Sequence, residues 1–227
     1  MDVDGFLLHV GVAGSGPDTL VLTGGPGCVQ YLERDEIAVP GRRCWYPEPR
    51  GVGRSQGGPH DMAQAVADLE AVRRSVGVAS WIVVGHSWGS DLAVRYALEH
   101  PEAVTGVVGV AGRGPQRDCT WSAAYEAGRP SEPDVPVEMA MEVWTSLSAS
   151  FTEWIHQPDL WRRLADSPLP MHFVAAGGDV RPPWPLQQLA ALVPNGRFST
   201  VPDVPHDFWS TDPNTWVETV ARVCADL

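Results

Sequence analysis

The sequence predicts an α/β fold in which a mostly parallel central sheet is flanked by helices. Short β-branched runs alternate with stretches of helical periodicity through most of the 227 residues, and repeated strand–helix units are typical of parallel sheets covered on both faces. The change from one rhythm to the other is sharpest at Gly85-His-Ser-Trp-Gly89. No Gly/Ser tract, charge block or repeat divides the chain, so we expect a single domain over residues 1–227.

Seven segments have the composition of strands, because they are short, apolar and bounded by turn residues. They are Phe6–Val12, Thr19–Leu22, Arg43–Tyr46, Trp81–Val84, Val104–Val110, Met171–Ala175 and Arg197–Val201. Helical spacing and end signals predict the helices. One begins at the cap Asp61 and ends at Gly77, and the others are at Ser87–Pro101, Pro185–Leu192 and Pro213–Cys224.

Residues 113–167 interrupt this alternation, with clustered prolines and an irregular pattern. Two apolar stretches in this segment have helical spacing, Met139–Leu147 and Phe151–Leu164. An insertion between two strands lies over the ends of the sheet, so we expect a small helical lid over residues 113–167. The large aromatic side chains of this segment would line the substrate pocket, and we name Trp121, Tyr125, Trp144 and Trp154 as substrate-binding residues.

Composition excludes several classes of function. The net charge is −12, the pI is near 4.9, and no arginine stripe exists, so we expect no binding to nucleic acid or to an anionic membrane. The chain has no lysine, which excludes Schiff-base chemistry and a P-loop. The four cysteines, Cys28, Cys44, Cys119 and Cys224, are too far apart for a typical zinc site. We predict no metal and no cofactor.

The start of the chain is acidic, Met1-Asp-Val-Asp4, and no apolar run has the length of a membrane span. We therefore expect a soluble, cytoplasmic protein. A monomer and a homodimer are both compatible with the sequence.

Ser87 is the centre of a G-x-S-x-G pattern between a predicted strand and a predicted helix. The flanking glycines, Gly85 and Gly89, are needed because a side chain at either position would collide with the neighbouring strand or helix. Such a turn leaves the serine hydroxyl free above the sheet, near the N-terminus of the helix. An ordinary glycine-rich turn that contains a serine is the alternative, and the rest of the chain decides between them.

A nucleophilic serine needs a base and a carboxylate that orients the base. Downstream of the insertion, Asp179 follows one predicted strand and His206 follows the next. Both therefore lie at the same edge of the sheet as Ser87. Asp203 and Asp207 are rivals for the carboxylate, but they are so close to His206 in sequence that turn positions suit them better.

Two backbone amides are needed for the negative oxygen of a tetrahedral intermediate. We predict the amide of Trp88, directly after the serine, and that of Gly25, in the glycine-rich loop 23–27. Asp91, four residues after Ser87, has two interpretations: a carboxylate on the helix surface, or a buried acid that changes the charge of the pocket.

Five motifs occur in order: Gly24-Gly-Pro-Gly27, Pro49-Arg-Gly-Val-Gly-Arg-Ser55, Gly85-His-Ser-Trp-Gly-Ser90, Gly178-Asp179 and Pro205-His206. With them the chain resembles the α/β-hydrolase superfamily, and the first three are most similar to the proline iminopeptidase branch. The resemblance implies Ser87 as nucleophile, His206 as base and Asp179 as orienting acid, with Gly25 and Trp88 at the oxyanion hole.

The chain departs from that branch at several points. Thr23 stands where a histidine is usual, Glu48 where another acidic residue is usual, and Pro205 where glycine is common. The insertion is also shorter than the peptidase cap, whose carboxylates receive the free amino group of the substrate. Four glutamates could do this here: Glu126, Glu138, Glu142 and Glu153.

The expected reaction is therefore hydrolysis of a small ester, lactone or amide through an acyl-enzyme on Ser87. Three alternatives stay open: a proline iminopeptidase-like aminopeptidase, an acyltransferase or carbon–carbon hydrolase on the same scaffold, and a small-ligand-binding protein with little turnover. The expected partner is a small-molecule acyl substrate.

Overall fold

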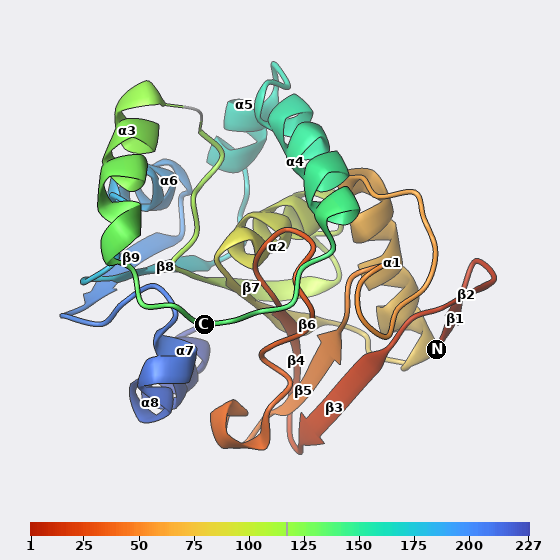
Figure 1. Ribbon diagram of the computed structural model, residues 1–227. Helices are drawn as coiled ribbons and strands as arrows, with labels where there is room; N and C mark the ends of the chain where they lie inside the picture. Colours follow the sequence, from red (N-terminus) through yellow and green to blue (C-terminus); the bar gives the residue numbers. More distant parts are fainter. Residues whose placement is uncertain (117) are drawn as a thin grey trace.

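The computed structural model describes residues 1–116 and 118–227, and its centre is a sheet of mostly parallel strands (Figure 1). In this part of the chain the sheet has seven strands, in the order β3-β5-β4-β6-β7-β8-β9. Only β3 runs antiparallel to its neighbour. The strands are β3 (Val10–Gly14), β4 (Asp18–Leu22), β5 (Arg43–Pro47), β6 (Trp81–His86), β7 (Val104–Val110), β8 (Met171–Ala176) and β9 (Gly196–Val201). The predicted fold class is confirmed.

The first predicted strand is wrong in its extent. Where we expected one strand over residues 6–12, the structure has a two-stranded hairpin, β1 (Asp2–Val3) and β2 (Phe6–Leu7), followed by the separate strand β3. The turn of the hairpin is Asp4-Gly5, and both residues have positive φ, 53° and 80°. An Asp-Gly pair is a strong signal for a two-residue hairpin turn, and it interrupts the apolar run.

Helices cover both faces of the sheet (Figure 1). One face carries α1 (Met62–Ser75), α2 (Trp88–Glu99) and α6 (Trp184–Leu192), whose apolar side chains join those of the strands in one core cluster. The other face carries the 3₁₀ turn at Asp35–Ile37, α7 (Phe208–Thr211) and α8 (Pro213–Ala225), which share a second cluster. The predicted cap Asp61 accepts a hydrogen bond from the amide of Gln64 at 2.8 Å. None of the described helices is long and apolar enough to cross a membrane.

The segment between β7 and β8 contains α3 (Cys119–Gly128), a 3₁₀ turn (Arg129–Ser131), α4 (Met141–Ile155) and α5 (Leu160–Ala165). The two predicted helical stretches here were wrong in their bounds, since α4 continues across the predicted gap at residues 148–150 and the break between the helices follows Ile155. Val143, Leu147, Phe151 and Trp154 form one buried stripe at helical spacing. In Figure 1, α3 lies on the side of α6 and α4 lies over α1 and α2. Two backbone hydrogen bonds, Val29 N to Glu138 O and Ala140 N to Gly27 O, tie the segment to loop 23–30.

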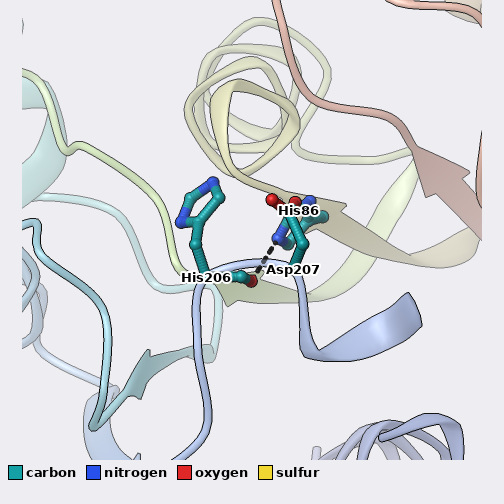
Figure 2. A group of neighbouring side chains, drawn as sticks. All are labelled: His86, His206 and Asp207. Atoms are coloured by element: carbon teal, nitrogen blue, oxygen red, sulfur yellow. Dashed lines mark hydrogen bonds between the residues drawn. The ribbon is translucent and has the colours of Figure 1, made fainter. Parts of the chain in front are cut away.

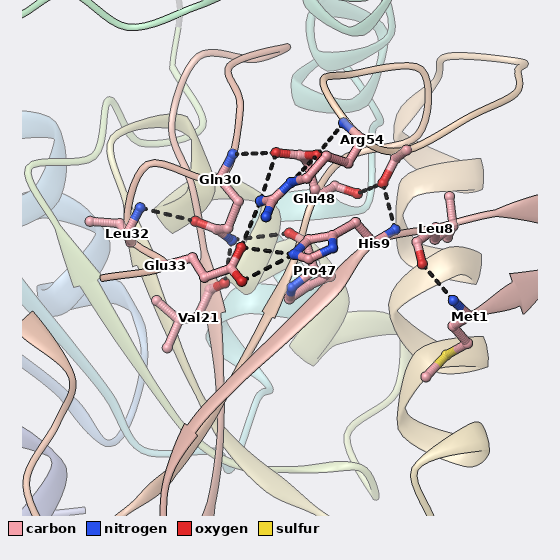
Figure 3. A network of polar contacts seen from close by, with 11 residues as sticks. Met1, Leu8, His9, Val21, Gln30, Leu32, Glu33, Pro47, Glu48 and Arg54 are labelled. Carbon is pink, nitrogen blue, oxygen red and sulfur yellow. Dashed lines mark hydrogen bonds and ion pairs between the residues drawn. The ribbon is translucent and has the colours of Figure 1, made fainter. Parts of the chain in front are cut away.

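A polar network around Glu48 holds loop 23–33 against loop 48–55 (Figure 3). Glu48 is 3% exposed, and its carboxylate accepts hydrogen bonds from the backbone amides of Gln30 and Arg54. Arg54 also bridges Glu48 to Glu33. Burial raises the pKa of Glu48, but the hydrogen bonds from Arg54 and Gln30 outweigh it and lower the pKa. The ionised Glu48 and its partners therefore hold the segment that contains the glycine-rich loop in place.

Candidate active site

Ser87 lies at the sharp turn between β6 and α2, with φ 54° and ψ −126°. A positive φ is strained for a residue other than glycine and is typical of functional turns. The two flanking glycines make the turn sterically possible. A Cβ on Gly85 would lie 2.1 Å from the carbonyl oxygen of Gly89, and a Cβ on Gly89 would lie 2.5 Å from that of Thr23. The crowding that the sequence predicts at both positions is therefore present.

The structure brings Ser87, His206 and Asp179 together. They follow β6, β9 and β8, so three loops at the same edge of the sheet supply them. His206 Nε2 is 3.1 Å from Ser87 Oγ, and His206 Nδ1 is 2.5 Å from Asp179 Oδ2. The side chains of His206 and Asp179 are only 8% and 5% exposed. The two other candidates for the orienting carboxylate lie elsewhere: Asp203 is in a turn with φ 57°, and Asp207 borders α7.

Charges around Asp179 keep it ionised. Burial raises its pKa, but the hydrogen bond to His206 and the charge of Arg181 outweigh this and lower the pKa to about 2. An ionised carboxylate can only accept hydrogen bonds, so His206 Nδ1 donates to it and Nε2 has a lone pair for the Ser87 hydroxyl. In this tautomer the imidazole can remove the hydroxyl proton.

Arg181, which the sequence reasoning missed, connects Asp179 to the inserted segment. Its guanidinium is 2.9 Å from Asp179 Oδ1, forms an ion pair with Glu132, and lies 4.5 Å from the ring centroid of Tyr125. Arginine suits such a shared site because its donors form a planar fork and its plane packs on aromatic rings. Its position in a Pro-rich loop two residues after Asp179 gave no pattern by which to recognise it.

The two predicted oxyanion-hole residues lie in the wall of the cavity next to Ser87. Trp88 is the first residue of α2, and the first amides of a helix have no intrahelical acceptor. Gly25 has φ +125°, and a Cβ on it would lie 2.8 Å from the amide nitrogen of Cys28. The neighbouring Gly24 amide is engaged, because it donates to Tyr31 Oη at 2.7 Å. The Gly24 amide is therefore not available for a substrate oxygen, and Gly25 is the next residue of the loop.

His86 connects Tyr31, in loop 23–33, to the backbone of His206. Figure 2 shows the contact between His86 and His206. Tyr31 Oη donates to His86 Nδ1 at 2.6 Å, and His86 Nε2 donates to the backbone oxygen of His206 at 3.0 Å. Burial, with the nearby His206, lowers the pKa of His86 to about 4, so the ring is neutral. Both ring nitrogens carry these hydrogen bonds, so the group His86, His206 and Asp207 in Figure 2 does not fit a metal site although its potential ligand atoms lie within 4.8 Å.

A cavity of about 460 Å³ opens above Ser87. Three of the four aromatic residues predicted to bind substrate, Trp121, Tyr125 and Trp144, line it. Trp154 does not, and this expectation is corrected. It is 1% exposed and packs in the core, 5.8 Å from the Arg95 guanidinium.

Charged and polar residues also line the cavity wall. Among the four glutamates considered for an amino group, Glu126 lines this cavity, whereas Glu138 and Glu153 border other hollows. Asp91 also lines it and is 2% exposed, so the buried-acid interpretation is the one that the structure supports. Further lining residues are Ser122, Ser148, Phe151, Thr152, Ile155, Arg113 and Arg181.

Residues 20–140 match the family model described as alpha/beta hydrolase fold. The chain belongs to this family. Curated relatives include the proline iminopeptidase of Neisseria meningitidis, 37% identical over 105 residues, and a probable proline iminopeptidase of Streptomyces coelicolor, 38% identical over 111 residues. Each match covers 41% of this chain and 32% of the relative. The chain therefore matches about a third of the length of these relatives.

Solved structures agree on the fold over nearly the whole chain. Est816, described as an N-acyl homoserine lactone degrading enzyme, has TM-score 0.75 and 18% identity, covering 96% of this chain and 97% of that one. An esterase of Exiguobacterium antarcticum has TM-score 0.72 and 19% identity, covering 98% and 97%. The proline iminopeptidase of Mycobacterium smegmatis has TM-score 0.73 and 17% identity, covering 98% and 96%. At these identities the likeness concerns the fold.

Proposed function

We propose that this protein is a serine hydrolase that cleaves a small ester, lactone or amide through an acyl-enzyme. The observation that carries the proposal is the hydrogen-bond chain from Asp179 through His206 to Ser87, with distances of 2.5 and 3.1 Å. His206 removes the Ser87 proton as the hydroxyl oxygen attacks the carbonyl carbon, and then protonates the leaving group. Water, deprotonated by His206, releases the acyl group in a second step.

The same proposal gives the surrounding residues their roles. The amides of Gly25 and Trp88 stabilise the negative oxygen of the tetrahedral intermediate. Residues 113–167 act as the lid of the cavity, with Trp121, Tyr125 and Trp144 against the substrate. A cavity of about 460 Å³, lined by both aromatic and polar side chains, suits one small molecule. Each step uses only side chains and amides of this chain, with no metal or cofactor.

A fluorophosphonate probe tests the proposal, because it phosphonylates an activated serine and peptide mass spectrometry locates the adduct. We expect labelling of Ser87 in the wild type and none in Ser87→Ala or His206→Ala. Ser90→Ala is the matched control, since Ser90 is on the same turn of α2 but is 1% exposed and does not line the cavity. Labelling that persists in His206→Ala would contradict the role of the base.

Aminopeptidase activity is the second candidate function, and Glu126 favours it. Its carboxylate is placed in the cavity with Ser87, where it could receive the free amino group of a peptide. The relatives named proline iminopeptidase also support it, although the match covers only 41% of this chain and 32% of the relative. Cleavage of prolyl-p-nitroanilide in preference to p-nitrophenyl esters, with a KM raised by Glu126→Gln, would favour this activity over the esterase.

A further inference from the structure

Asp91 places a carboxyl group in the cavity wall one helical turn after Ser87. It is 2% exposed, and its Oδ1 accepts a hydrogen bond from the amide of Gly114 at 2.8 Å. Among residues 1–116 and 118–227, no group donates a hydrogen bond to the other oxygen, Oδ2. A buried oxygen without a donor is costly, so this position is one where a bound ligand with a donor would recover stability.

The distance between Asp91 and Ser87 fits a substituent on the acyl part of a substrate. Ser87 directly precedes α2 and Asp91 is on its first turn, and both line the same cavity. The side chain of a helical residue tilts toward the N-terminus of its helix, which for Asp91 is the end where Ser87 lies. The carbonyl carbon must sit about 3 Å from the Ser87 hydroxyl oxygen. A donor on the second or third carbon of the acyl chain would therefore reach Asp91.

The charges near Asp91 favour a neutral donor over a cation. Burial raises the pKa of Asp91 to about 7, and the backbone amide of Gly114, the charge of Arg113 and the backbone amide of Arg113 offset only part of this. Arg113 lines the same cavity, with its guanidinium 5.1 Å from the Trp121 ring. A substrate ammonium would meet this positive charge, whereas a hydroxyl group would not.

We propose that Asp91 determines specificity by accepting a hydrogen bond from a hydroxyl group on carbon 2 or 3 of the acyl group. The inference rests on the proposed hydrolase function and narrows its substrates to hydroxyacyl esters, lactones or amides. A site built to bind a hydroxyl rejects the analogue that lacks it, because its own polar group is then left unpaired. Asp91 is thus a group that recognises substrate and takes no part in proton transfer at Ser87.

The test uses pairs of p-nitrophenyl esters in which a methyl group replaces the hydroxyl: 3-hydroxybutyrate with 3-methylbutyrate, and lactate with 2-methylpropanoate. We expect the wild type to favour the hydroxyl member of at least one pair by about 10-fold or more in kcat/KM. Asp91→Leu should bring this ratio to about 1, and Asp91→Asn, which keeps an oxygen acceptor, should give an intermediate ratio. Asp91→Ala replaces the leucine variant if that variant does not fold.

Glu142→Gln is the matched control for the loss of one negative charge, because Glu142 is exposed on α4 and does not line the cavity. Its ratio should equal that of the wild type. A third ester, 3-aminobutyrate, separates the two kinds of donor, and a higher kcat/KM for it than for 3-hydroxybutyrate would overturn the choice of a hydroxyl. If turnover is slow, protection of Ser87 from the fluorophosphonate by 3-hydroxybutyramide and by 3-methylbutyramide gives the same ratio.

The outcomes separate this inference from the proposed function. Equal rates within both pairs in the wild type, or an unchanged ratio in Asp91→Leu, would overturn the role of Asp91 while hydrolysis through Ser87 stands. An absence of both labelling and hydrolysis would overturn the proposed function, and with it the inference.

Discussion

The floor and the roof of the cavity are built in different ways. The floor, residues 85–90 with loop 23–27, is so closely packed that a Cβ added to any of its glycines would lie within 3.0 Å of another atom. The roof, α3 and α4, is made of side chains on helices, and Trp144 in it is 39% exposed. The floor therefore tolerates no added atom, whereas the roof can change its side chains and keep its shape. On the proposed function, we therefore expect the floor to place the nucleophile and the roof to select the substrate.

The largest effect should come from one carbon added to the floor. In Gly89→Ala the new Cβ would lie 2.5 Å from the carbonyl oxygen of Thr23 and 2.6 Å from that of Leu22, so β4 and α2 must separate. We expect labelling of Ser87 by the fluorophosphonate to fall by more than about 100-fold, since small displacements of reacting groups are that costly. Gly106→Ala is the control, because its nearest neighbour is the side chain of the terminal Leu227. Near-normal labelling of Gly89→Ala would contradict this, because it would show that the floor can accommodate a Cβ at residue 89 without displacing Ser87.

In the roof, two tryptophans should behave in opposite ways. Trp154 is 1% exposed in the core, so Trp154→Ala should lower the free energy of unfolding by about 3–5 kcal/mol. Trp121 faces the cavity, so Trp121→Ala should cost less stability and act chiefly on the KM for esters. Urea unfolding and ester kinetics on both variants measure the two effects. A Trp154→Ala variant with normal stability and a raised KM would return Trp154 to the substrate site.

This division also explains how much the sequence could predict. The floor was predictable because its glycines, Ser87 and the strand-to-helix change are local signals, and because parallel strands bring Asp179 and His206 to the same edge. The roof was not, because α4 is one helix with two faces and only packing decides that Trp144 meets the cavity while Trp154 meets Arg95. The direction in which Asp91 points likewise depends on how loop 111–114 folds back onto α2.

The residues beneath the floor should make stability depend on pH. The pKa of His86 is about 4 in the folded protein and near 6.5 when the ring is exposed, so protonation favours the unfolded state. This contribution is complete above pH 6.5 and is lost as the pH falls toward 4, by about 3 kcal/mol. Asp91, whose pKa is raised to about 7, contributes a slope of opposite sign between about pH 4 and pH 7, so the His86 contribution is measured as the difference in unfolding free energy between the wild type and His86→Gln in urea at a series of pH values. Asp179, with a pKa of about 2, adds a further loss only between about pH 4 and pH 2. An equal slope in His86→Gln would contradict the assignment.

The smallest predicted effect concerns Tyr31, which joins the floor to His206. Its hydroxyl accepts from the Gly24 amide and donates to His86 Nδ1, so Tyr31→Phe leaves two buried polar groups without a partner. Each such group costs about 1–3 kcal/mol when fully unpaired, and we expect about 2 kcal/mol in total because the loop can relax. Labelling of Ser87 should slow by about 10-fold, since Gly25 follows Gly24 and the His206 backbone is held through His86. Tyr46→Phe is the control for the loss of a tyrosine hydroxyl, because Tyr46 is in the same core cluster, is 1% exposed and does not line the cavity. If Tyr31→Phe loses stability but labels at the wild-type rate, the link supports the fold and does not position the reacting groups.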